Sequence, residues 1–263
     1  MSDSTLPSHS AAVLFEDLPV VTQPQLDGLL LQHFSTAKIV SSNKNSYVVK
    51  VADLEISMLY LDEPYPQAEL KSVLPLNYTL QNGDEIVSKQ DAHIIISVLT
   101  PAANQAQAIG QAITLTHLIA VISQLAKIQA VLWINSGSLQ NSEMFNGTLQ
   151  TLGKAIDAQR KGEPAGILLP LIFWTPVRIY SPDQGAKTFG ARSSGLNAFV
   201  GVELDLLPQS ITAQESAEQI LNLVAYQFQS GAKFKAGDSM EIAGSQFQIK
   251  ESDQPHILSV VVG

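Results

Sequence analysis

The sequence contains no cysteine, and this absence excludes several kinds of chemistry. A chain without thiols forms no disulfide bond, holds no thiolate-bound zinc and has no cysteine nucleophile. Histidine is sparse as well, and no two histidines stand at His-x-x-x-His spacing; the five are His9, His33, His93, His117 and His256. We therefore expect no metal site and no cofactor.

Charged residues are scarce, at 15% of the chain against 45% hydrophobic residues. This apolar content is enough for a sizeable core, so it excludes global disorder. The charge that is present is mainly acidic, with 15 Lys and Arg against 24 Asp and Glu and a formal net charge of -9. Nucleic acids and anionic membrane surfaces attract clustered basic residues, so neither is expected as a partner.

Long hydrophobic runs are missing too. Residues 1–10 are polar and rich in serine, without a basic start or an apolar core, so we expect a disordered tail and no secretory signal. The apolar stretch over residues 102–126 is interrupted by Thr114, His117 and Gln124, short of the roughly 20 apolar residues that a membrane span needs. The expected location is therefore cytoplasmic.

The most apolar part of the chain is residues 92–142, where Lys127 is the sole formal charge. Residues 93–99 and 130–134 are short apolar runs, which are typical of strands buried on both faces of a sheet. Between them, residues 102–126 have helical composition, with Thr100 as an expected cap. The pattern predicts a central βαβ unit with two parallel strands.

Similar reasoning predicts the other elements and the fold. Strands are expected over residues 11–15, 46–51, 54–60, 168–180, 198–206, 240–242, 247–249 and 256–262, and helices over 23–34, 67–74, 142–161 and 212–229, the last with a Thr212–Glu215 capping box. The fold class is α+β and α/β-like, a two-layer mixed sheet with helices packed on it. We expect an N-terminal lobe over 11–161 and a C-terminal β-β-α-β-β lobe over 167–263, packed on the same core.

A candidate crevice follows from the βαβ prediction. Asn135, Ser136 and Ser138 come directly after the second strand, and ligands of open α/β sheets bind outside the carboxyl ends of strands. Trp133 would add an aromatic wall to a small-molecule or hydrolase site. The same residues are more typical of an ordinary turn beside a buried tryptophan, so turn chemistry favours this second interpretation.

A second candidate site is acidic. Glu203 and Asp205 alternate on one face of the strand over 198–206, and Asp183 and Arg192 lie in a loop expected over 181–195. Two carboxylates on one face can act as a general acid and base. More often such a pair belongs to a solvated face, which here would meet a basic partner.

Several short segments carry a family resemblance. Residues 91–95 read Asp-Ala-His-Ile-Ile, and further segments are Leu132-Trp133, Thr188-Phe189-Gly190, Gly201-Val202-Glu203-Leu204-Asp205 and Gly237-Asp238-Ser239. In these the chain resembles the bacterial family called domain of unknown function 4261. The chain departs from that family's pattern because the glycine-to-glutamate spacing is one shorter and Asp205 replaces a glutamate. The family has no established activity, so the resemblance implies a fold and no catalytic residue.

Two functions remain open at this point. The first is a non-enzymatic protein-binding module, such as an immunity or adaptor protein for a basic partner, because no catalytic constellation can be assembled from recognisable motifs. The alternative is a small-molecule-binding or hydrolase domain that uses the crevice near Asn135 and Ser136. The sequence predicts no oligomeric state.

Overall fold

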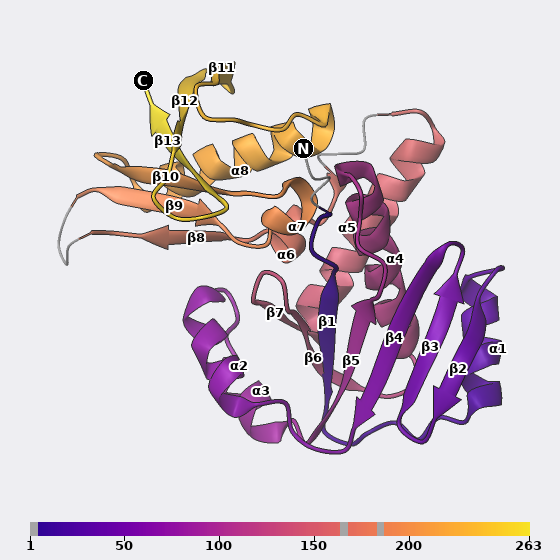
Figure 1. The fold of residues 1–263 in the computed structure, drawn as a ribbon. Coiled ribbons are helices and arrows are strands. Elements are labelled where there is room, and N and C mark those ends of the chain that lie inside the picture. The colour runs from indigo at the N-terminus through magenta and orange to yellow at the C-terminus, as the bar shows by residue number, and fades with distance from the viewer. Residues whose placement is uncertain (1–4, 164–167, 183–186) are drawn as a thin grey trace.

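The computed structural model describes residues 5–163, 168–182 and 187–263, which form two sheets with helices around them (Figure 1). One sheet has seven strands, all antiparallel to their neighbours, and the other has six strands with one parallel pair. The α+β class is confirmed, whereas the expected single mixed sheet is wrong. We refer to residues 5–163 as the first lobe and to the described residues from 168 on as the second lobe.

The first lobe carries the seven-stranded sheet, in the order β2-β3-β4-β5-β1-β6-β7. Its strands are β1 (Ser10–Phe15), β2 (Lys38–Asn43), β3 (Ser46–Val51), β4 (Leu54–Leu61), β5 (Ala92–Val98), β6 (Ile128–Trp133) and β7 (Ser138–Asn141). Its helices are α1 (Gln23–His33), α2 (Gln67–Val73), the 3-10 turn η1 (Leu74–Leu76), α3 (Gly83–Lys89), α4 (Gln105–Ile122) and α5 (Ser142–Arg160).

The second lobe carries the six-stranded sheet, in the order β11-β12-β13-β10-β9-β8. Its strands are β8 (Val177–Tyr180), β9 (Phe189–Ser193), β10 (Glu203–Gln209), β11 (Ser239–Ile242), β12 (Ser245–Glu251) and β13 (Ile257–Val262). Its helices are α6 (Leu171–Trp174), α7 (Asn197–Val200) and α8 (Ala213–Ser230). Helix α8 begins with the expected capping box, in which the Thr212 hydroxyl accepts from the N–H of Glu215.

Strand β1 lies between β5 and β6, which corrects the central βαβ prediction. Ser10 pairs with Ser97 of β5, and Ala11 pairs with Trp133 of β6, both antiparallel. The strands β5 and β6 are therefore parallel to each other and joined through α4, but they are not neighbours. The physical reason is that β1 is itself apolar at every position after Ser10, so a central place buries both of its faces.

Helices cover the two faces of this sheet unequally. Alternate residues of β1, such as Val13, face a large core that includes residues of α1, α4 and α5 and continues into the second lobe. The intervening residues, Ala12 and Leu14, face a smaller core formed with α2 and α3. Strand β4, which lies between β3 and β5, alternates between buried and more exposed residues, so this part of the sheet has one face covered and one face toward solvent.

Residues 5–10 differ from the expected disordered tail. Leu6 is 6% exposed and donates its N–H to the carbonyl of Ala102 at 2.9 Å, while His9 is fully buried. Residues 1–4 lie outside the described residues. Because residue 102 bonds to this segment, α4 begins later than predicted, and Asn104 replaces Thr100 as its cap by accepting from the N–H of Gln107.

Three further predictions are wrong in the second lobe. The strand expected over 198–206 begins only at Glu203, because residues 197–200 form the helix α7. The strand expected over 168–180 is the short helix α6 followed by β8, because Pro170 and Pro176 lack the N–H groups that a continuous strand needs. The loop expected over 181–195 contains the strand β9. Its Gly190 pairs with Tyr180, whose ring would lie 2.6 Å from a Cβ at that position, so glycine reflects close packing rather than a loop.

The lobes meet where Gly195 approaches Ser136. Gly195 has a φ of +88°, and a Cβ at this position would lie 2.7 Å from both the Cβ of Ser136 and the carbonyl oxygen of Trp174. The indole N–H of Trp174 donates to the hydroxyl of Thr116 in α4 at 3.0 Å. The second lobe is thus fixed to the first by close backbone approach and a buried hydrogen bond.

We expect Gly195→Ala to lower the free energy of unfolding by about 2–4 kcal/mol, because the added methyl group forces the lobes apart and strains the left-handed backbone. The matched control is Gly153→Ala, which adds the same group on α5 with nothing within 4 Å and should stabilise by roughly 0.5–1 kcal/mol. Urea unfolding measures both. Equal effects from the two variants would show that the lobe junction is not tightly packed.

Candidate functional site

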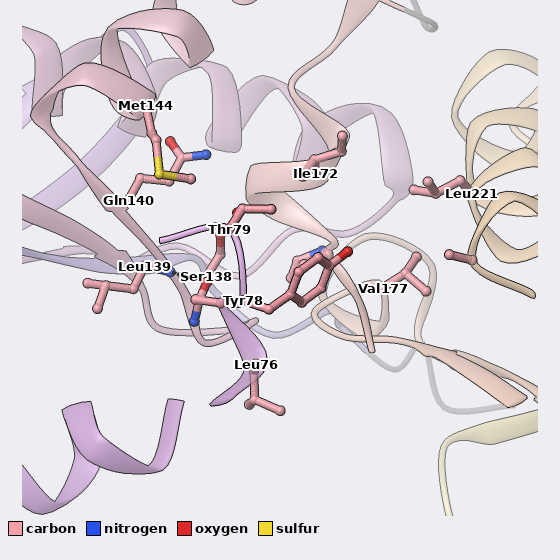
Figure 2. A pocket seen from close by; sticks show the side chains of 13 residues that line it. Leu76, Tyr78, Thr79, Ser138, Leu139, Gln140, Met144, Ile172, Val177 and Leu221 are labelled. Carbon is pink, nitrogen blue, oxygen red and sulfur yellow. Dashed lines mark hydrogen bonds between the residues drawn. The ribbon is translucent and has the colours of Figure 1, made fainter. Parts of the chain in front are cut away.

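An apolar cleft lies between the two lobes. A cavity of about 120 Å³ is lined by residues 76–79, by β7 and by Val177 at the start of β8. It adjoins a wider groove of about 640 Å³ between α5, α6 and α8, and the two share Gln140, Met144, Ile172 and Leu221 as lining residues. We call the combined space the interlobe cleft. Figure 2 shows Met144 and Gln140 on one side, Val177 and Leu221 on the other, and Tyr78 and Ile172 between them.

The lining of the interlobe cleft is uncharged. Of the described residues that line it, none is Asp, Glu, His, Lys or Arg. Two of its large apolar side chains are also unusually exposed, Tyr78 at 73% and Ile172 at 68%. Exposed apolar side chains grouped around a cleft mark binding sites more often than isolated ones do. This surface can therefore hold apolar groups.

Hydrogen bonds fix the floor of the cleft. The hydroxyl of Thr148 donates to the side-chain oxygen of Gln140 at 2.8 Å, and both residues are buried. Asn77 accepts from the N–H of Leu139 at 2.9 Å and donates to the carbonyl of Gly137 at 2.9 Å. These bonds connect the loop after η1 to β7, so this side of the cleft is formed before any ligand arrives.

Charge around the cleft is acidic. Among the described residues next in the chain to a lining residue, the exposed charged ones are Glu143, beside Met144, and Glu218, beside Ala217. Arg178 also adjoins a lining residue, but it is half-buried and donates to the carbonyl of Ser136 at 3.0 Å. Burial lowers the pKa of the Arg178 guanidinium below its ordinary value.

The crevice predicted at the ends of the central strands is filled. The carboxyl ends of β5 and β6 do lie on one edge of the sheet, but Ser10 stands between them. Asn135 accepts from the N–H of Ser10 at 2.8 Å and donates to the carbonyl of Ser8 at 2.9 Å. Its role is to hold the N-terminal segment in place.

The other residues of that predicted crevice are buried. Trp133 is 0% exposed, Ser136 is 1% exposed and Ser138 is 4% exposed. The Ser136 carbonyl accepts from Arg178 and from the Ser194 hydroxyl, so this residue belongs to the lobe junction. Ser138 lies in β7 and lines the interlobe cleft. The turn interpretation of these residues thus agrees with the structure.

His9 occupies the space where the crevice was expected. Its ring lies 4.6 Å from that of Phe199 and 5.7 Å from that of Trp133, between centroids. Its Nε2 lies 3.0 Å from the carbonyl oxygen of Ala108, which requires a proton on that nitrogen. Burial lowers the pKa of His9 from 6.5 to about 4, so the ring is neutral at pH 7.

The acidic candidates are structural. Asp205 is 6% exposed and accepts from Tyr180 at 2.8 Å and from Arg192 at 2.7 Å. This carboxylate raises the pKa of Arg192, and burial, together with the hydrogen bond to Asp205, raises the pKa of Tyr180. The prediction of a solvated acidic face is wrong for Asp205, because the side chains of Tyr180 in β8 and Arg192 in β9 lie against this carboxylate. Arg192 also donates to Gln254 at 3.1 Å.

Glu203 has a separate structural role. Its carboxylate accepts from the backbone N–H groups of residues 195–197 at 2.7–3.2 Å and from the Ser193 hydroxyl at 2.5 Å. It therefore satisfies the backbone donors at the start of α7. Asp183, the remaining acidic candidate, lies outside the described residues.

Within the described residues, no group of three or more His, Cys, Asp and Glu side chains could hold a metal ion. None of the helices in the described ranges is long and apolar enough to cross a bilayer.

Sequence reasoning missed the interlobe cleft because separate elements contribute its lining. Residues 168–180 carried a usable signal, since an apolar run with Pro170 and Pro176 inside it is a poor strand. The exposure of Tyr78 and Ile172 depends on packing between the lobes, which no local pattern records. No family model, no curated protein and no solved structure matches this chain. The resemblance to domain of unknown function 4261 stays a prediction.

The buried His9 predicts a pH dependence of stability. Because its pKa is about 4 in the folded chain and 6.5 in the unfolded chain, the unfolded state binds protons preferentially below pH 6.5. Stability is therefore complete above pH 6.5 and is lost as the pH falls toward 4. From pH 7 to 5 we expect His9 to account for a loss of about 2 kcal/mol in the free energy of unfolding.

The control is His9→Gln, whose amide can donate to Ala108 and does not titrate. Urea unfolding of both proteins at pH 7 and pH 5 measures the difference in pH dependence. If both proteins lose the same stability between these pH values, His9 is not buried as a neutral ring.

The buried carboxylate Asp205 should be needed for stability. Asp205→Asn removes the ion pair with Arg192 and should lower the free energy of unfolding by about 2–3 kcal/mol. The matched control is Asp157→Asn, whose side chain is 67% exposed and lies 3.7 Å from Arg160, and which should change stability by less than about 0.5 kcal/mol. Thermal or urea unfolding compares the two variants. If Asp205→Asn leaves the free energy of unfolding unchanged, the buried ion pair of Asp205 does not contribute to stability.

Proposed function

We propose that this protein is a non-enzymatic protein-binding module and that the interlobe cleft is its binding site. The observation that carries the proposal is an uncharged cleft flanked by the exposed side chains of Tyr78 and Ile172. Interfaces gain most of their binding energy from a few apolar and aromatic anchors that become desolvated. Tyr78 supplies such an anchor together with a hydroxyl at the edge of the site.

The alternative crevice enzyme receives less support. Its nucleophile would be Ser136, whose hydroxyl is buried beside the carbonyl oxygens of Trp133 and Phe173. A serine nucleophile needs a base within hydrogen-bond reach and access to substrate. The contacts of Ser136 include neither a histidine nor a carboxylate among the described residues. The protein-binding function is therefore the better supported of the two.

The expected partner carries basic residues around an apolar segment. Glu143 and Glu218 stand next to lining residues, and the chain as a whole has a formal charge of -9. Such a field speeds encounter with a cationic surface, while the apolar contacts determine how long the complex lasts. An immunity or adaptor role fits this description. The cytoplasmic location stays a prediction.

The test is selection from a displayed library of peptides randomised over about ten positions. We expect enriched peptides to combine apolar residues with Lys or Arg. Their affinity for Ile172→Glu should fall about tenfold or more, because a carboxylate would be buried against apolar groups. Since Ile172 is 68% exposed, the variant should keep its melting temperature. Fluorescence anisotropy with the selected peptides measures the affinity.

The matched control is Val20→Glu, which places the same charge on a residue that is 94% exposed and outside the cleft. It should bind the peptides as the unaltered chain does. Equal losses in the two variants would contradict a site in the cleft. Turnover of an ester or amide substrate that disappears in a folded Ser136→Ala variant would favour the enzyme instead.

A further inference from the structure

The strand β8 has one unpaired edge. It forms the end of the six-stranded sheet and pairs with β9 on one side. Among the described residues, no other strand pairs with it, and no side chain or loop hydrogen-bonds to the backbone of Val177–Tyr180. An outer strand presents a row of N–H and C=O groups, which is a ready template for another strand.

The corresponding edge of the first lobe is closed. Strand β7 ends the seven-stranded sheet, but the side chain of Asn77 occupies its outer edge. That amide accepts from the Leu139 N–H and donates to the Gly137 carbonyl, as a neighbouring strand would. Of the two sheet edges that border the interlobe cleft, β8 is the one that keeps its backbone groups available.

The free edge of β8 starts at the cleft. Pro176 and Val177 line the same cavity as residues 76–79 of the first lobe. In Figure 1, β8 is the strand of its sheet that lies nearest to the first lobe and α2. A segment placed along β8 would therefore have backbone hydrogen bonds on one side and the apolar lining of the cleft beside it.

We propose that an extended segment of the partner adds to β8 as a further strand, an inference that rests on the proposed function. Its alternate side chains are apolar and enter the interlobe cleft, and Lys or Arg residues flank them. Strand addition of this kind obtains affinity from main-chain hydrogen bonds and specificity from the pockets that receive alternate side chains.

The surroundings of β8 select this occupant. A helix satisfies its own backbone groups and would leave those of β8 unpaired. A second copy of the chain would have to place its own β8, together with its own residues 76–79, in the same cleft. A single extended segment needs far less room. The acidic residues Glu143 and Glu218 adjoin lining residues, which favours basic flanks on the segment.

The experiment uses the full chain and a synthetic peptide of about ten residues in which Val alternates with Thr between Lys pairs. Two derivatives carry backbone N-methyl groups on alternate residues: one on the odd-numbered residues and one on the even-numbered residues, which we call the two phases. Each phase removes the N–H donors from one edge of the extended peptide. We expect one phase to weaken binding about tenfold or more and the other to change it less than about twofold. Replacing the Lys pairs by Glu should weaken binding about tenfold at low salt.

Hydrogen exchange locates the peptide on the chain. Binding should slow exchange of alternate amides in residues 177–180 and leave β2, the outer strand at the far end of the other sheet, unchanged. If both N-methyl phases act alike while Ile172→Glu still abolishes binding, strand addition is wrong and the cleft site survives. If Ile172→Glu has no effect while residues 177–180 become protected, the cleft site is wrong instead.

Other occupants give their own results. A chain that is dimeric without peptide, with residues 177–180 already protected, would place a second copy on the edge and overturn the proposal. The proposal would also be overturned by two results together. The synthetic peptide would fail to bind, while the peptides selected from the library would bind the cleft without alternating apolar residues. Equal binding by the Glu-flanked peptide would overturn the basic-partner part.

Discussion

The burial of β1 between β5 and β6 is the constraint on which the rest of the structure depends. Residues 11–15 are 0% exposed, because helices cover both faces of the strand and hydrogen-bonded neighbours cover both edges. This position fixes where the chain before β1 must run. Residues 6–9 continue past the ends of β5 and β6, where His9 meets Phe199 of the second lobe. One strand thus organises the first sheet and also anchors the second lobe.

The polar residues of the lobe junction are used internally, and this explains the character of the cleft. Arg178 and Ser194 bond to the carbonyl of Ser136, while Asp205 and Glu203 are satisfied within the second lobe. Buried charges are stable when they are paired and hydrogen-bonded. The polar side chains at the lobe junction therefore bond to one another and to the backbone, and do not line the interlobe cleft. What remains between the lobes is a cleft whose described lining residues carry no charge.

Local patterns predicted the elements much better than their pairing. The apolar runs of β5 and β6 and the capping box at Thr212 are properties of a few consecutive residues, and all of them are found. The insertion of β1 between β5 and β6 joins segments about 80 and 120 residues apart, and no short window contains it. The burial of Asp205 could not be predicted from a local pattern either. Its side chain does point to the opposite face of β10 from Leu204 and Leu206, but the alternation does not show whether that face is covered. The burial of Asp205 depends on the side chains of Tyr180 and Arg192, which the neighbouring strands β8 and β9 bring against it.

The cleft shows the same limit for function. Its lining comes from residues 76–79, β7, α5, α6, β8 and α8, none of which carries a recognisable binding motif. Of the predicted polar residues, Asn135, Ser136 and Glu203 bond within the fold, since polar residues near strand ends are needed to satisfy backbone groups where the chain turns. In an uncharged cleft, specificity must come from the fit of apolar side chains and from the direction of backbone donors. Under the proposed strand addition, the closed edge at Asn77 and the open edge at β8 determine how a bound segment would lie. With β7 occupied by the side chain of Asn77, an extended segment in the cleft finds main-chain partners along β8 alone among the described strands that border it.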